Sequence, residues 1–176
     1  MNIFKIITSK YAVLIVLIAA IFCWIGVGWQ YFMIKEESSQ ESPRPESILI
    51  KLYYYNQDKA EEIGDLCSSD AVITVERKIP ASPNPIRDTI RLLIKGELTA
   101  KEKEQGFSTE FPNSEFKLSG SKLENGVLSL EFTEVPGFTN GGSCRIGILK
   151  AQIEKTAKQF PIVKEVVIKP EYLFQP

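Results

Sequence analysis

The cysteines are the side chains with the clearest capacity for covalent chemistry in this sequence. There are three, Cys23, Cys67 and Cys144, and no pair has the Cys-x-x-Cys spacing of zinc ribbons or thioredoxin-like sites. In an exported domain Cys67 and Cys144 would meet an oxidising environment, so we predict a disulfide between them. The alternative is a reactive thiolate at Cys144, stabilised by a helix N-terminus and Arg145. That alternative needs a base, and the chain contains no histidine.

The glycines ahead of the last long helical pattern form a second candidate site. Gly141, Gly142 and Ser143 lead into an apolar helical repeat over residues 146–160. We expect Ser143 to cap this helix, because its hydroxyl can accept from amides of the first turn. The alternative is a small-anion site made of these backbone amides and Arg145. The sequence lacks the Lys-Ser/Thr ending of a nucleotide-binding P-loop.

Two carboxylates, Glu131 and Glu134, raise the alternative of a hydrolase or binding module for cell-wall glycan that uses region 131–145. Their offset places them on opposite faces of a strand or across its end, so surface charge is the better interpretation. Asp65 and Asp70 lack an ordered calcium-binding loop. We therefore predict no catalytic residues, no metal site and no cofactor.

The run Tyr53-Tyr54-Tyr55 lies in an apolar segment with strand character. Alternation places Tyr54 on one side of the strand, and Tyr53 and Tyr55 on the other. If the second side is open, Tyr53 and Tyr55 form a candidate interaction surface, since tyrosine is enriched at interfaces. If a helix covers it, both are core residues, and the sequence leaves the two alternatives open.

The elements that must position these residues predict one α/β (α+β) domain over residues 48–176. We expect one mixed β-sheet with two main helices packed on it. Asn125-Gly126 predicts a hairpin turn, because both residues tolerate positive φ, and Gly96 predicts a helix C-terminus. Residues 56–66 are polar and loop-like. The expected strands cover residues 48–55, 71–79, 116–123, 127–132 and 163–168, and the expected helices cover 86–96 and 146–160.

An apolar run near the N-terminus predicts a membrane anchor. Residues 11–34 are long enough to span a bilayer as a helix. Lys5 and Lys10 precede this run, and acidic residues follow it, which predicts a cytoplasmic N-terminus. We expect a cytoplasmic segment at 1–10, a transmembrane helix at 11–34, a linker at 35–47 and an extracytoplasmic domain at 48–176. A cleaved signal peptide is the alternative, but no small-residue cleavage site follows the run.

The overall composition is that of a globular protein. The chain has 176 residues, of which 44% are hydrophobic and 24% charged, with a net charge of −1. Its basic residues are scattered, so no nucleic-acid partner is predicted.

The chain resembles the GerMN domain family of sporulation and spore germination proteins, which also occurs in lipoproteins. The resemblance runs in order over most of residues 48–170. Its pieces are Leu52-Tyr53-Tyr54, Ala71 to Arg77, Leu92 to Thr99, Gly106 to Thr109 with Pro112, Asn125-Gly126-Val127 with Glu131-Phe132, Gly142 to Arg145, and Ala151 to Glu154 through Phe160 to Val163.

This resemblance implies an architecture related to ring-building modules and no established catalysis. It implies a domain at the cell membrane that acts in envelope assembly through a protein partner or self-association. A peptidoglycan contact is a further expectation.

Overall fold

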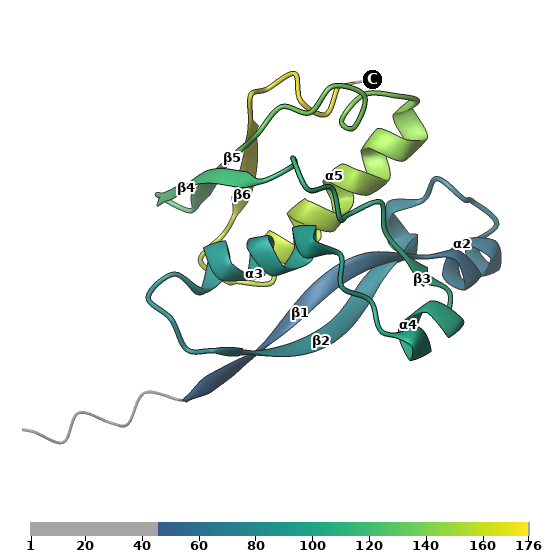
Figure 1. The fold of residues 1–176 in the computed structure, drawn as a ribbon, viewed down its shortest axis with the longest axis horizontal. Coiled ribbons are helices and arrows are strands. Elements are labelled where there is room, and N and C mark those ends of the chain that lie inside the picture. Colours follow the sequence, from purple (N-terminus) through teal and green to yellow (C-terminus); the bar gives the residue numbers. More distant parts are fainter. Residues whose placement is uncertain (1–45, 176) are drawn as a thin grey trace, which may run out of the picture. The chain divides into compact units, whose positions relative to one another are not determined.

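Two three-stranded sheets and two long helices make up the fold (Figure 1). The structure is a computed structural model, and it describes residues 46–175. The first sheet has the order β2 (Val72–Pro80), β1 (Ser47–Asn56), β3 (Phe107–Ser108), with antiparallel pairing throughout. The second has the order β4 (Leu118–Glu124), β5 (Val127–Phe132), β6 (Glu165–Lys169). In it β4 and β5 are antiparallel, whereas β5 and β6 are parallel and are connected through helix α5.

The prediction of one mixed sheet is wrong, although the mixed α and β character and the two main helices are confirmed. These helices are α3 (Pro85–Lys95) and α5 (Ser143–Lys158). The second sheet does not pair with β1, because side chains of α5 bind the backbone groups of Lys51 and Tyr53 at that strand edge. The remaining helices are α2 (Gln57–Ile63), the 3₁₀ turn Ser69–Ala71 and α4 (Ala100–Glu104).

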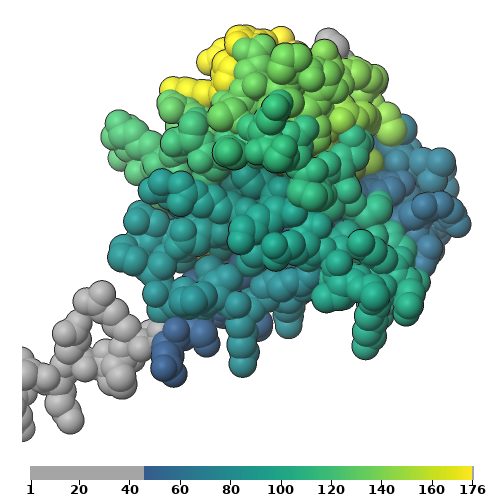
Figure 2. Space-filling view, viewed as in Figure 1, coloured from purple at the N-terminus to yellow at the C-terminus, as the bar shows by residue number. Residues whose placement is uncertain are grey.

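A single hydrophobic core joins both sheets to both long helices. On β1 the buried side chains alternate with more exposed ones, and the buried Tyr54 hydroxyl donates to the Leu93 carbonyl of α3 at 3.0 Å. Phe116 stacks on Phe132 with ring centroids 4.9 Å apart, and it also contacts Phe111. Figure 2 shows the result, with the C-terminal part of the domain in close contact with the earlier strands and helices.

Local sequence signals explain where several elements begin and end. Gly96 ends α3 with a φ of +62°, as predicted. Asn125 and Gly126 have φ values of 51° and 86° and connect β4 to β5, which confirms the hairpin. Helix α2 was not predicted. The Asn56 side chain starts it by accepting from the Lys59 amide at 2.8 Å.

The predicted transmembrane helix at 11–34, its N-terminal flank and most of the linker lie outside the described residues. Within residues 46–175, no helix combines the length and apolar character needed to cross a bilayer.

Candidate functional site

One polar face of helix α5 organises the candidate site. Arg145, Gln152, Thr156 and Gln159 share this face, because their spacings are close to whole helical turns. Each forms a hydrogen bond to a segment distant in sequence. The partners are Glu110 for Arg145, Thr109 for Gln152, the Tyr53 amide for Thr156, and the Lys51 amide and carbonyl for Gln159.

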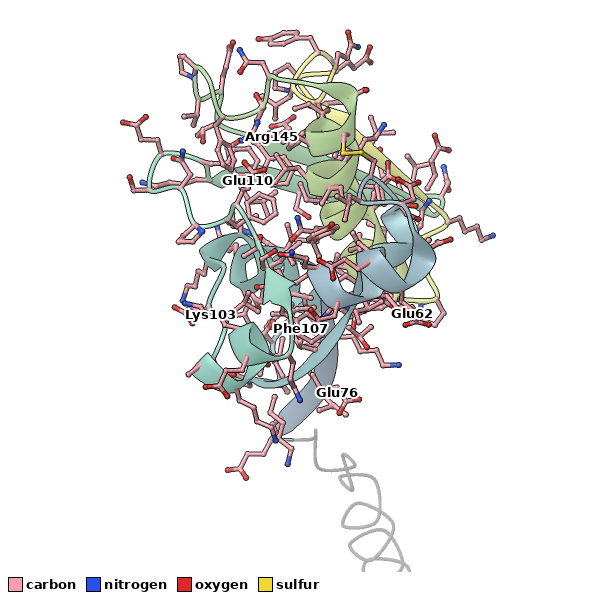
Figure 3. All side chains as sticks on the ribbon, turned by 90° about the vertical axis from the view of Figure 1, so that its right-hand side faces the viewer. Glu62, Glu76, Lys103, Phe107, Glu110 and Arg145 are labelled. Atoms are coloured by element: carbon pink, nitrogen blue, oxygen red, sulfur yellow. A yellow bond between two sulfur atoms is a disulfide. The ribbon has the colours of Figure 1, made fainter. Side chains whose placement is uncertain are left out.

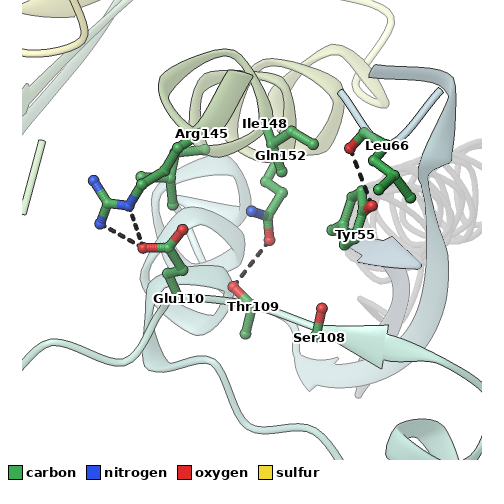
Figure 4. A pocket seen from close by; sticks show the side chains of 9 residues that line it. Tyr55, Leu66, Ser108, Thr109, Glu110, Arg145, Ile148 and Gln152 are labelled. Carbon is green, nitrogen blue, oxygen red and sulfur yellow. Dashed lines mark hydrogen bonds and ion pairs between the residues drawn. The ribbon is translucent and has the colours of Figure 1, made fainter. Parts of the chain in front are cut away.

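A pocket of about 340 Å³ lies between this face and the end of β1, and we call it the α5 pocket (Figure 4). Its apolar lining comes from Tyr55, Leu66, Ile148 and Leu149. Leu149 is part of the core, whereas Leu66 is 58% exposed. The pocket therefore has an apolar wall that extends from the core to the surface.

The opposite wall of the α5 pocket is polar, and Gln152 is its deepest member. Gln152 is only 1% exposed. Its Oε1 accepts a hydrogen bond from the Thr109 hydroxyl at 3.0 Å. Its Nε2 group forms no hydrogen bond with any of residues 46–175, and Figure 4 shows it directed into the pocket. The amide donor of a largely buried side chain therefore opens onto the pocket space.

An ion pair between Arg145 and Glu110 closes one end of the pocket (Figure 4). The Arg145 guanidinium donates through Nε to Glu110 Oε2 at 2.5 Å, and its Nη2 also contacts this oxygen. Its Nη1 donates to the carbonyls of Phe138 and Asn140 at 2.7 and 2.8 Å. Because Arg145 is paired with a carboxylate, the predicted anion site at its end of the helix gains no support and stays a prediction.

A disulfide joins Cys67 to Cys144, as predicted, with Cα atoms 4.9 Å apart. The reactive-thiolate alternative for Cys144 is therefore wrong for this structure. Figure 3 shows the bond at the end of α5 that carries Arg145. The bond connects the loop that contains Leu66 to the start of α5, so it holds together two segments that line the pocket.

The capping prediction for Ser143 is wrong. Ser143 is the first residue of α5, and Gly142 occupies the N-cap position without a side-chain hydrogen bond. Gly141 precedes it with a φ of +140°, a conformation that favours glycine. The glycines thus allow a tight entry into the helix, and Arg145 donates to the carbonyls of the loop that precedes it.

Glu131 and Glu134 contact different neighbours. Glu131 packs over Gly120, where an added Cβ would lie 2.6 Å from Glu131 Oε2. Glu134 accepts a hydrogen bond from the Tyr172 hydroxyl at 3.0 Å, and this bond raises the pKa of Tyr172. Each carboxylate therefore has its own structural contact, as the surface-charge interpretation expects.

The tyrosines divide between two roles. Both Tyr53 and Tyr55 are half-buried and lie on the side of β1 opposite Tyr54. Tyr55 lines the α5 pocket, and its hydroxyl donates to the Leu66 carbonyl at 3.1 Å. The structure thus brings Tyr55 and Arg145 to one pocket, whereas Tyr53 is outside it.

Sequence reasoning missed Thr109, Glu110 and Gln152. For Gln152, the sequence did contain an indication of burial, because this residue lies on α5 beside the apolar repeat of Leu149 and Ile153. A polar residue so placed is often buried and hydrogen-bonded. Thr109 and Glu110, the partners of Gln152 and Arg145, come from a segment without regular structure, for which the sequence has no periodic signal.

A second, larger hollow of about 790 Å³ lies between the end of α3 and residues 112–118. Its charged lining residues, Arg91, Lys95, Glu97 and Lys117, are all exposed, and no polar side chain that lines it is buried. Residues 46–175 also contain no group of three or more acidic or cysteine side chains placed to hold a metal ion. The α5 pocket is thus the better candidate for specific binding.

Comparisons with known proteins agree with this architecture. The structure is similar to the first GerMN domain of the sporulation protein GerM from Bacillus subtilis, with a TM-score of 0.50 at 16% identity over 69% of this chain and 80% of that one. It is also similar to the tandem GerMN domains of that protein, with a TM-score of 0.48 at 20% identity over 76% of this chain and 42% of that one. A comparison with curated proteins finds no match. The Germane family, described as "Sporulation and spore germination", matches residues 51–171. Since this match covers most of the sequence, the chain belongs to the Germane family.

Proposed function

We propose that this chain is a non-catalytic interaction module of sporulation- or germination-type envelope assembly. The helix predicted at 11–34 tethers it to the cell membrane, and its Germane domain lies outside the cytoplasm. There the domain contacts a protein partner or a second copy of itself.

The family match over residues 51–171 is the observation that carries this proposal. It covers nearly the whole described domain, from β1 to β6. The disulfide between Cys67 and Cys144 supports the extracytoplasmic part, because disulfides persist in oxidising compartments.

The chemistry of the α5 pocket supports binding over catalysis. Arg145 and Glu110 are paired with each other, and Gln152 has no acid or base chemistry at ordinary pH. An amide donor and an apolar wall are typical of a recognition site.

The placement is tested with a C-terminal tag and external protease on intact cells. We expect the tag to be removed from intact cells expressing the full chain. Loss of the tag only after the cells are permeabilised would contradict the proposed orientation. A cytoplasmic protein measured in the same samples serves as the control for cell integrity.

The interaction role is tested by crosslinking the full chain in its native membrane and by light scattering after size-exclusion chromatography of the detergent-extracted protein. We expect a defined crosslinked species that contains either two copies or one other protein. A monomer without any crosslinked partner would contradict the role as an assembly module.

A further inference from the structure

We infer that the α5 pocket is a peptide-binding site. It takes a neutral segment of a partner protein, and one peptide group of that segment lies between Gln152 and Glu110. This inference rests on the proposed interaction role and names the surface and the chemistry that would perform it.

The Gln152 side-chain amide has one group bonded and one group free among residues 46–175. Its Oε1 is fixed by the Thr109 hydroxyl at 3.0 Å, which orients the Nε2 group towards the pocket. No side-chain nitrogen or oxygen of residues 46–175 is both fully buried and without a partner, so this Nε2 group is accessible through the pocket. At 1% exposure Gln152 has little access to water beyond the pocket itself, so a ligand carbonyl there would satisfy this donor.

Glu110 supplies an acceptor across the pocket from Gln152. The Glu110 contacts with Arg145 use only Oε2, and Oε1 has no hydrogen-bond donor among residues 46–175. Figure 4 shows Glu110 and Gln152 directed towards the same space. One donor and one acceptor facing each other match the C=O and N–H of an amide group.

The pocket has no unbalanced charge. Among residues 46–175, the only charged side chains that line it are Arg145 and Glu110, and they form an ion pair. A free anion would need a positive group, and Arg145 already donates to Glu110 and to two backbone carbonyls. The pocket therefore favours a neutral ligand over a phosphate or a carboxylate.

An apolar wall lies next to these polar groups. Leu66 and Ile148 present aliphatic surface beside the Tyr55 ring. A volume of about 340 Å³ is at the low end of small-ligand pockets, which suits one peptide group and one apolar side chain. Leu66 is 58% exposed without a ligand, and such a side chain would cover it.

A glycan N-acetyl group also carries a neutral amide, but the lining favours a peptide. A sugar ring adds many hydroxyls, whereas Ser108 is the one pocket-lining residue among 46–175 whose hydroxyl forms no hydrogen bond, so most of them would lie against Leu66 and Ile148 without a partner. The Tyr55 hydroxyl is already bonded to the Leu66 carbonyl. An aliphatic side chain fills this wall without such a cost.

The experiment measures binding of N-acetyl-leucine N-methylamide to the full chain by NMR, following the side-chain amide signals of glutamine. N-acetylglucosamine and inorganic phosphate are the comparison probes. We expect the diamide alone to shift the Gln152 signal in a saturable way, with a Kd of about 1 mM for a ligand of this size.

Three variants locate the binding. Gln152→Met removes the donor at similar volume, and Leu66→Ser removes the apolar contact at an exposed position. Leu49→Ser is the matched control, because Leu49 is 60% exposed and does not line the pocket. We expect at least a fivefold weaker Kd in the first two variants and an unchanged Kd in the control. If Gln152→Met fails to fold, Leu66→Ser alone decides.

Saturable binding of N-acetylglucosamine or phosphate at Gln152 without binding of the diamide would overturn the inference. So would the absence of any shift in the folded protein, or equal weakening in Leu66→Ser and Leu49→Ser. A crosslinked partner that remains unaffected by Leu66→Ser would reject the pocket as the docking site while leaving the proposed interaction role in place.

Discussion

The side-chain amide of Gln159 pairs with the backbone of Lys51 as a neighbouring strand would. Its Oε1 accepts from the Lys51 amide at 2.7 Å, and its Nε2 donates to the Lys51 carbonyl at 2.6 Å. Two residues along the same edge of β1, the Tyr53 amide donates to the Thr156 hydroxyl at 3.0 Å. Helix α5 therefore satisfies a strand edge that would otherwise be open to pairing.

Gln159→Ala should destabilise the domain by about 1–2 kcal/mol, because two hydrogen bonds to Lys51 are lost at a partly exposed site. Gln159→Glu should cost at least as much, since it places a carboxylate oxygen against the Lys51 carbonyl. Urea unfolding measures both effects. Lys158→Ala, an exposed position next in the helix, is the control and should change little. A similar loss in the control would show that the effect belongs to the helix end in general.

The same edge explains why the sequence predicted most elements but not their assembly into sheets. The hairpin at Asn125 and Gly126 and the helix end at Gly96 follow from local backbone preferences, and the structure confirms both. The rest of the β1 edge, beyond its pairing with β3, is covered by tertiary packing: Gln159, 108 residues from Lys51, binds it there. No local pattern carries that information, so one mixed sheet was predicted where two exist.

The α5 pocket was only partly predictable from the sequence, because it too depends on contacts between distant segments. Tyr55, Arg145 and the disulfide stood out by residue type, but nothing in the sequence placed Tyr55 and Arg145 at one pocket. Gln152 is the buried polar side chain that lines the pocket, and its partner Thr109 lies in a segment without regular structure. Long-range contacts of this kind depend on the tertiary packing of α5.

The disulfide should contribute strongly to stability. It closes a loop between residues separated by 77 positions, and loop entropy then predicts about 4 kcal/mol. The double variant Cys67→Ser and Cys144→Ser and the reduced wild type should lose similar amounts in urea unfolding. Thiol labelling of the unfolded protein should show Cys67 and Cys144 only after reduction. Labelling of either cysteine in unreduced protein would contradict the bond.

Gly96 should be the least replaceable helix-ending glycine. An added Cβ would lie 2.1 Å from the Phe111 carbonyl oxygen, and the φ of +62° is itself unfavourable for alanine. Gly96→Ala should therefore cost about 2–4 kcal/mol, the sum of backbone strain and forced displacement of the neighbouring chain.

Gly64→Ala is the matched control for Gly96, because Gly64 also ends a helix with positive φ, at +79°, and has no atom within 4 Å of an added Cβ. It should cost only about 1 kcal/mol. Thermal or urea unfolding of the two variants separates the steric effect from the backbone effect. Equal losses would mean that the contact with Phe111 relaxes freely.

The ion pair between Arg77 on β2 and Glu102 on α4 should make stability depend on acid pH. Their closest atoms are 2.7 Å apart, and the hydrogen bond from Arg77 lowers the pKa of Glu102 from 4.5 to about 2. A carboxyl with a lowered pKa stabilises the folded state above its unfolded pKa. This contribution should disappear as the pH falls from about 4.5 to about 2. We expect a loss of about 1–2 kcal/mol after allowance for screening by water.

Urea unfolding at several pH values in this range checks that dependence. Glu102→Gln should be less stable than the wild type at pH 5, and the difference should shrink towards pH 2, because protonation removes the same charge from the wild type. Glu104→Gln, an exposed change on the same helix, should retain the wild-type pH dependence. A constant difference between Glu102→Gln and the wild type across the range would contradict a contribution from the charge of Glu102.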